Sequence, residues 1–169
     1  MQKKINRGDT RLKLLIVARL RYPKRVDLLI ESLNDLDIDL FIVGDGPLMI
    51  EMEKYKVQKN IHFLGEVDGF SNFKNYDIFA LISESEGLPL SALEAMSAGL
   101  LVLMSSNIMI KDYIQNESFV SIFEYGDHDS FKRRLIGMMD LEDVEFATRS
   151  KLSRTVSTKF QWHNIAKEV

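Results

Sequence analysis

The stretch of sequence that decides the fold is DIFALISESEGLPLSALEAMSAGLLVLM, residues 77–104. It opens with a short apolar run over residues 77–82, which is typical of a buried strand in a parallel sheet. A helix is expected over residues 88–98, because Pro89 lies in its first turn and Gly99 directly follows its end. A second apolar run predicts a strand over residues 100–104. Strand, helix and strand in this order predict two parallel strands joined by a helical crossover.

The same alternation extends in both directions along the chain. Further strands are expected over residues 12–18, 40–43, 61–64 and 119–123. Further helices are expected over residues 26–36, 48–58, 70–75, 108–115, 128–139, 142–156 and 161–169. This alternation predicts an α/β fold: an open, mostly parallel, Rossmann-like sheet with helices on both faces. With 169 residues and no internal linker, the chain is expected to form one domain.

Composition narrows the possible classes of protein and of site. The absence of cysteine excludes a disulfide framework and a thiolate metal site. His62, His128 and His163 lack the spacing of metal ligands, so neither a metal nor another cofactor is expected. No apolar run approaches the roughly 20 residues that span a bilayer, and no signal-peptide pattern opens the chain, so we expect a cytoplasmic protein. A net charge of −3 does not favour nucleic-acid binding.

The two ends of the chain differ from its middle. The first 25 residues hold nine lysines and arginines against a single acid, Asp9. We interpret residues 1–11 as a linker or the remnant of a connection to another domain, and a solvated tail would explain most of this charge. The last segment, residues 157–169, predicts a helix that docks by burying the rings of Phe160 and Trp162.

Polar residues and glycines gather directly after the predicted strands. In strand order these clusters are Arg19, then Gly44-Asp45-Gly46, Gly65-Glu66, residues 83–87 and residues 105–107. Ligands of an open parallel sheet bind beyond the carboxyl ends of its strands. The five clusters therefore predict one long binding cleft at that edge.

The cluster before residues 88–98 is the most informative. A helix N-terminus offers free backbone N–H groups and about half a positive charge, so it can bind an anion. Gly87 lets a ligand approach the backbone closely. Glu86 and Glu94 can both face one ligand, because carboxylates accept hydrogen bonds from paired hydroxyls, as on a ribose or a hexose. Alternatively, Glu86 only interacts with the helix dipole and Glu94 is solvated, although a carboxylate on a mostly apolar helix needs a partner.

Two cations stand near the first predicted strand. Arg19 follows it, and Lys24 lies five positions later near the next helix start. Forked guanidinium donors and a lysine point charge suit one diphosphate, although plain surface solvation is an alternative. The turn at residues 44–47 lacks the spacing of a dinucleotide fingerprint and of a P-loop. For it we expect a structural role, with glycine for close packing and proline starting a helix.

From about residue 12 onward, the sequence resembles the C-terminal domain of the retaining GT-B glycosyltransferases of group 1, which include glycogen-synthase-like and polysaccharide-assembly enzymes. Four parts appear in the order of that family. Arg19-Leu20 with Lys24 is similar to its G-R-L…K-G signature, residues 43–47 to V-G-D-G-P, and residues 61–67 to V-x-F-L-G-x-V. Residues 85–99 match its E-x7-E element, followed by A-M-A-x-G.

The resemblance implies a role for each matching residue. Arg19 and Lys24 would hold the donor diphosphate and Glu86 the sugar hydroxyls, which makes these three the candidate catalytic residues. Glu94 would hold the ribose hydroxyls. The backbone of Gly87, Leu88, Pro89 and Leu90 would lie near sugar and phosphate, and the turn of Gly65, Glu66 and Val67 along the base. Such enzymes transfer with retention and without a metal, because cations and a helix dipole stabilise the leaving diphosphate.

The sequence also departs from the family pattern. Ala18 and Arg25 stand where the family has the glycines before Arg19 and after Lys24. After the fifth strand, residues 105–107 and Asp112 stand where it has a glycine pair and a glutamate. These departures affect the phosphate and sugar ends of the expected site.

A GT-B enzyme has an N-terminal domain that binds the acceptor, so the resemblance implies that this chain is one half of an enzyme. It would bind a UDP- or GDP-sugar, be inactive alone, and pack residues 157–169 toward that N-terminal domain. Bacterial polysaccharide or glycolipid assembly is the expected setting, with membrane contact only through the full-length protein. The alternatives are a GT-B-like sugar-nucleotide epimerase or phosphorylase and a non-catalytic nucleotide-binding module.

Overall fold

The computed structural model describes residues 11–21, 26–33, 35–56, 58–84, 86 and 89–160. Three of the predicted site residues, Lys24, Gly87 and Leu88, lie outside these ranges, as do residues 1–10 of the proposed linker and the expected helix at residues 161–169.

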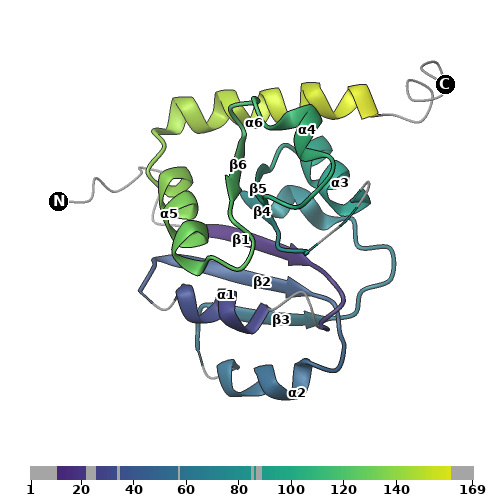
Figure 1. Ribbon diagram of the computed structural model, residues 1–169, viewed down its shortest axis with the longest axis vertical. Coiled ribbons are helices and arrows are strands. Elements are labelled where there is room, and N and C mark those ends of the chain that lie inside the picture. The colour runs from purple at the N-terminus through teal and green to yellow at the C-terminus, as the bar shows by residue number, and fades with distance from the viewer. Residues whose placement is uncertain are drawn as a thin grey trace.

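Six parallel strands form one open sheet (Figure 1). They are β1 (Leu12–Val17), β2 (Ile38–Val43), β3 (Ile61–Gly65), β4 (Ile78–Leu81), β5 (Leu101–Ser105) and β6 (Val120–Phe123). Their order across the sheet is β3-β2-β1-β4-β5-β6, and every neighbouring pair is parallel. The strand order reverses between β1 and β4, which is the position where such sheets bind ligands. The predicted α/β class and Rossmann-like sheet are confirmed.

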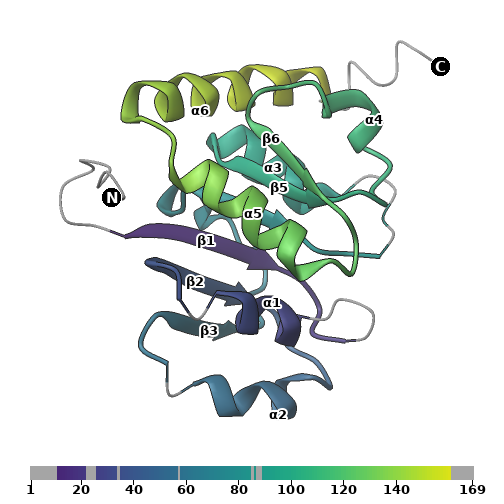
Figure 2. The ribbon, with the colours of Figure 1, turned by 60° about the vertical axis from the view of Figure 1, so that its left-hand side comes forward.

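Helices cover both faces of the sheet (Figures 1 and 2). They are α1 (Val26–Ser32), α2 (Met49–Met52), α3 (Leu90–Ala98), α4 (Lys111–Ile114), α5 (His128–Met139) and α6 (Asp143–Ser157), with 3-10 turns η1 (Glu53–Tyr55), η2 (Asn72–Asn75) and η3 (Thr158–Phe160). From the centre, the chain moves toward β3 in its first half and toward β6 in its second. Right-handed crossovers in opposite directions place α1 and α3 on opposite faces. Accordingly, α1 packs beside α5, and α3 packs beside α6.

The core lies on both sides of the central strands. All four residues of β4 and all five of β5 are buried. Helices on both faces leave such strands no solvent side, which explains why they appear in the sequence as continuous apolar runs. The helix α3 buries the small residues Ala92 and Ala95 together with Met96. Small side chains let it lie close to the sheet.

Three helices are shorter than the sequence pattern predicts. α1 ends at Ser32, α2 has four residues and passes into η1, and α4 is a single turn. Leu48, Met52 and Tyr55 are nonetheless buried at helical spacing. Apolar periodicity determines which side chains face the core, and short turns satisfy it as well as one long helix. Before α4, for example, Lys111 N–H donates to Ile108 O, three residues back, at 3.1 Å.

Tyr55 also connects two of these elements. Its hydroxyl donates to Oε1 of Glu31 on α1 at 2.5 Å. Burial, and then this hydrogen bond, raise the pKa of Tyr55. The contact fixes η1 against α1. None of the helices in the described residues combines the length and the apolar character needed to cross a membrane.

Candidate functional site

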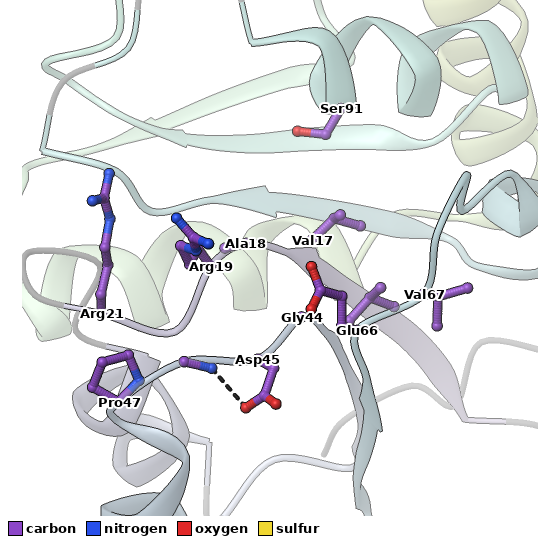
Figure 3. A pocket seen from close by; sticks show the side chains of 12 residues that line it. Val17, Ala18, Arg19, Arg21, Gly44, Asp45, Pro47, Glu66, Val67 and Ser91 are labelled. Carbon is purple, nitrogen blue, oxygen red and sulfur yellow. Dashed lines mark hydrogen bonds between the residues drawn. The ribbon is translucent and has the colours of Figure 1, made fainter.

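A cleft of about 930 Å³ opens beyond the carboxyl ends of β1, β2 and β3, opposite the start of α3 (Figure 3). Its lining residues are Val17, Ala18, Arg19, Arg21, Val43, Gly44, Asp45, Gly46, Pro47, Glu66, Val67 and Ser91. They come from four segments that are far apart in the sequence. The predicted edge of the sheet is therefore the edge that carries a cleft.

The glycine turn after β2 closes tightly on the loop after β1. Ala18 N–H donates to Val43 O at 3.0 Å, and Leu20 N–H donates to Asp45 O at 2.9 Å, so the pairing of the two strands continues into their loops. A Cβ on Gly44, whose φ is +133°, would lie 2.0 Å from the carbonyl oxygen of Ala18. Only glycine fits at that distance and in that conformation. The expected structural role of this turn in close packing agrees with this geometry, and the turn fixes the backbone around Arg19.

Two arginines project from this fixed loop into the cleft. The side chains of Arg19 and Arg21 are exposed, and neither forms an ion pair with a residue that the structure describes. Figure 3 shows both rising toward the side of the cleft on which α3 carries Ser91. Two guanidinium groups here present forked donors to an anion. Sequence reasoning singled out Arg19 and missed Arg21. The sequence carried no clear signal for Arg21, because Leu20 lies in a tight turn in which Arg21 N–H donates to Arg19 O at 3.0 Å, and not in a strand, where residues two apart point the same way.

The N-terminus of α3 forms the facing wall. Ser91, in the first turn of the helix, lines the cleft. The bend before it is fixed by buried Pro89, whose carbonyl accepts from Ala92 N–H at 3.0 Å. The first N–H groups of a helix have no partner within the helix, and they carry its partial positive charge. The cleft thus lies between two guanidinium groups and a helix N-terminus, an arrangement that favours a phosphate.

The loop after β3 forms the other end of the cleft. Glu66 and Val67 line it, and Figure 3 shows Val67 at the opposite end from Arg21. Gly65, whose φ is +72°, accepts a hydrogen bond from Gly44 N–H at 2.7 Å. The glycine turn therefore holds in place both this loop and the loop after β1 that carries Arg19 and Arg21, which we call the arginine loop.

The two predicted carboxylates lie outside the lining of this cleft. Glu86 is half-buried, and its Oε1 accepts a hydrogen bond from the Ser83 hydroxyl. Glu94 is exposed on α3, one turn after Ser91, and no hydrogen bond or ion pair joins its carboxylate to the described residues. An exposed carboxylate keeps its hydration, so Glu94 needs no partner in the chain alone, which agrees with the solvated alternative. Its role with a ligand stays a prediction.

The structure brings together only part of the predicted site. Arg19, Glu66 and Val67 line the cleft. Gly65 and Leu90 directly precede lining residues, and Pro89 lies two positions before Ser91. Besides Arg21, sequence reasoning did not propose Asp45, Pro47 or Ser91 as site residues. They reach the cleft through the meeting of separate loops, which no single segment of sequence shows.

No metal-binding cluster of three or more histidine, aspartate or glutamate side chains occurs in the part of the chain that the structure describes. His62 stacks on Phe41, with ring centroids 4.4 Å apart and planes at 16°. His128 begins α5. Both positions agree with the structural or solvated roles expected for the histidines.

Comparison with known proteins finds a matching family model and relatives of similar sequence. The family model described as glycosyl transferases group 1 matches residues 1–156. The O-antigen biosynthesis glycosyltransferase WbnH of Escherichia coli is 44% identical over 102 residues, which cover 59% of this chain and 30% of that protein. The chain thus spans less than a third of that relative.

Solved structures share the fold at lower identity. The sucrose-phosphate synthase of Thermosynechococcus elongatus superposes with a TM-score of 0.79 at 19% identity, over 94% of this chain and 43% of that one. HepE of Anabaena, solved in complex with UDP, gives a TM-score of 0.75 at 16% identity, over 88% of this chain and 44% of that one. At these identities the likeness shows the fold alone.

Proposed function

This chain belongs to the group 1 glycosyl transferases, with the fold of the C-terminal domain of a GT-B enzyme, and we propose that it binds the nucleoside diphosphate sugar from which a retaining enzyme transfers a hexose. The observation that carries this proposal is the cleft in which Arg19 and Arg21 face the N-terminus of α3. A donor of this class has a diphosphate at its centre. Cationic donors on one wall and a helix N-terminus on the other suit that group.

The proposed donor lies along the cleft in one direction. Its diphosphate contacts Arg19. We propose a second contact from Lys24, which lies outside the described residues. The base lies beside Gly65, Glu66 and Val67, at the end of the cleft farthest from Arg21. The ribose hydroxyls bind Glu94, one turn beyond Ser91 on the same face of α3. Glu86, with the backbone of residues 87–90, holds the sugar.

The proposed transfer breaks the bond between C1 of the sugar and the β-phosphate oxygen. Its electron pair leaves with the nucleoside diphosphate, and the acceptor oxygen bonds C1 on the same face. The acceptor proton passes to the leaving phosphate oxygen. Charge grows on the diphosphate during this step. Arg19 and the α3 dipole are preorganised to stabilise it, and Lys24 would add a second cation, so we propose no role for a metal ion.

The names of relatives support a proposal for the pathway in which this chain acts. WbnH is named for O-antigen biosynthesis, and HepE holds UDP. We propose that this chain serves a bacterial polysaccharide or glycolipid pathway on the cytoplasmic side of the membrane. The acceptor would bind a separate N-terminal domain, and the chain alone would bind the donor without transferring it.

Isothermal titration calorimetry with UDP and GDP, in buffer containing EDTA, tests this proposal. We expect one of the two nucleotides to bind the unaltered chain at submillimolar to millimolar concentration. Arg19→Gln and Glu94→Ala should each weaken that binding by about 1–3 kcal/mol, the scale of a lost hydrogen bond to a charged group. Arg134→Gln, an exposed arginine on α5 with no part in the cleft, is the matched control.

Three results would overturn the proposal. One is no heat with either nucleotide at millimolar concentration, and another is equal losses in the Arg19 variant and the Arg134 control. Binding that is seen in a parallel titration with Mg²⁺ but is absent in EDTA would contradict the metal-free mechanism.

A further inference from the structure

Ser83 makes a contact that the proposed function does not use. It follows β4 by two residues, and only 2% of its surface is exposed. Its hydroxyl donates a hydrogen bond to Oε1 of Glu86. An ionised carboxylate can only accept, so the direction of this bond is determined. Because a charge-assisted bond is about twice as strong as one between neutral groups, Ser83 restrains the direction of the Glu86 side chain.

Ser83 is itself held by the neighbouring strand. Ser105, the last residue of β5, is completely buried, and its hydroxyl donates to Ser83 O at 2.6 Å. Ser105 pairs in register with Phe123 of β6, so the sheet fixes its position. A hydrogen-bonded chain therefore runs from β5 through Ser105 and Ser83 to the carboxylate of Glu86.

The backbone of Glu86 has a second support. Its carbonyl oxygen accepts a hydrogen bond from Met109 N–H at 3.2 Å, in the turn between β5 and α4. Ser83 and Met109 thus hold the two ends of one residue. Ser83 lies in the loop between β4 and α3, and Met109 in the turn between β5 and α4. Neither support comes from the arginine loop, which follows β1.

We propose that Ser83 is a positioning residue for the donor sugar, which orients the Glu86 carboxylate, and that Ser105 supports it. This inference rests on the proposed function, in which Glu86 binds the sugar hydroxyls. A carboxylate accepts about four hydrogen bonds, so one from Ser83 sets its direction without exhausting its capacity. A carboxylate that is already oriented also loses less side-chain freedom when the sugar binds.

The test compares a nucleotide sugar with its free nucleotide, because Glu86 contacts only the sugar in this scheme. Calorimetry with UDP, UDP-glucose, UDP-galactose, GDP and GDP-mannose first identifies the tightest nucleotide sugar. Ser83→Ala should then raise the Kd for that nucleotide sugar by about threefold to tenfold, and change the Kd for the free nucleotide by no more than about twofold. Ser105→Ala should act in the same direction with a smaller effect, and it carries the test if Ser83→Ala does not fold.

Two controls separate positioning from a general loosening of the loop. Ser97→Ala removes an exposed hydroxyl that bonds only to the carbonyl of Glu94 in its own helix, at 2.8 Å, and should change neither affinity. In a Glu86→Ala background, Ser83→Ala should cause no further loss, because it acts through Glu86.

The outcomes distinguish this inference from the function on which it rests. If the unaltered chain binds neither nucleotides nor nucleotide sugars, the proposed function fails and the inference fails with it. If it binds them and Ser83→Ala leaves the sugar contribution unchanged, only the inference fails. Equal losses for free nucleotide and nucleotide sugar would also overturn it, because they would indicate a structural role.

Discussion

Arg19 and Arg21, two positions apart in the sequence, supply the positive charges of the cleft. The N–H of Arg21 donates to the carbonyl of Arg19 at 3.0 Å, which keeps this short segment in one conformation. Both side chains consequently reach the same cleft. The whole chain has a net charge of −3, so this local pair of cations contrasts with the charge of the molecule.

At the residue scale, we predict that Arg21 contributes to binding of the diphosphate. Arg21→Gln should raise the Kd for the nucleotide by about fivefold to tenfold, or about 1–1.4 kcal/mol, because a forked cationic donor is lost. Arg21→Lys should recover part of that loss, since a point charge remains. The measurement is calorimetry, with Arg134→Gln as control. An Arg21→Gln variant that binds as tightly as the control would show that Arg21 lies in the cleft without contacting the ligand.

At the scale of elements, the cleft depends on how loops close on one another. The turn after β2 hydrogen-bonds to the loop after β1 and to the loop after β3. On the opposite wall, Gly99, whose φ is +90°, caps the end of α3, and Arg154 of α6 donates to the carbonyl of Ala98 from Nη2 at 3.0 Å. Contacts at the far end of α3 therefore help to hold the end that faces the cleft.

A matched pair of glycine substitutions tests the role of the turn. Gly44→Ala should lower the free energy of unfolding by about 2–4 kcal/mol, because the new Cβ would lie 2.0 Å from the Ala18 carbonyl oxygen at a φ of +133°. It should also weaken nucleotide binding by displacing the arginine loop. Gly137→Ala is the control. Gly137 lies in α5 with nothing within 4 Å of an added Cβ, so the change should stabilise the chain by up to about 1 kcal/mol.

Urea denaturation measures both effects. Similar changes for the two variants would indicate that the close approach at Gly44 is not important for stability.

At the scale of the whole molecule, the position of the cleft follows from the topology. The order β3-β2-β1-β4-β5-β6 places the reversal between β1 and β4. Loops after β1 and β4 therefore leave in opposite directions and open a crevice there. Arg19 and Arg21 come from one side of the reversal and α3 from the other. The site is made by the two halves of the sheet together.

Two exposed arginines in the cleft predict a clear dependence of nucleotide binding on salt. Raising the NaCl concentration from about 0.05 M to about 0.5 M should weaken nucleotide binding several-fold, because shorter screening lengths reduce the attraction of exposed guanidinium groups. The Arg19→Gln variant should show a shallower dependence. Calorimetry across a salt series checks this. An affinity that is independent of salt would contradict binding through exposed charges.

Much of the fold could be predicted from the sequence. The apolar runs identified six strands, and the pairing of Pro89 with Gly99 identified α3 within two residues. Helix length was less predictable. At residues 48–58 and 108–115 one long helix was expected in each segment, but a four-residue helix that passes into a 3-10 turn and a single-turn helix take their place. Periodicity records which side chains meet the core, not which backbone hydrogen bonds form.

The sequence by itself determined the class of fold, the edge that carries the cleft and the place of Arg19 at that edge, because strand periodicity, helix ends and strand-end clusters are local patterns. Only the tertiary structure decided that Arg21 and Ser91 share the cleft, that Gly44 lies against Ala18, and that Ser83 and Ser105 hold Glu86. It also placed Glu94 in solvent. The physical reason is that these contacts join segments tens of residues apart, and their geometry depends on the order and register of the strands.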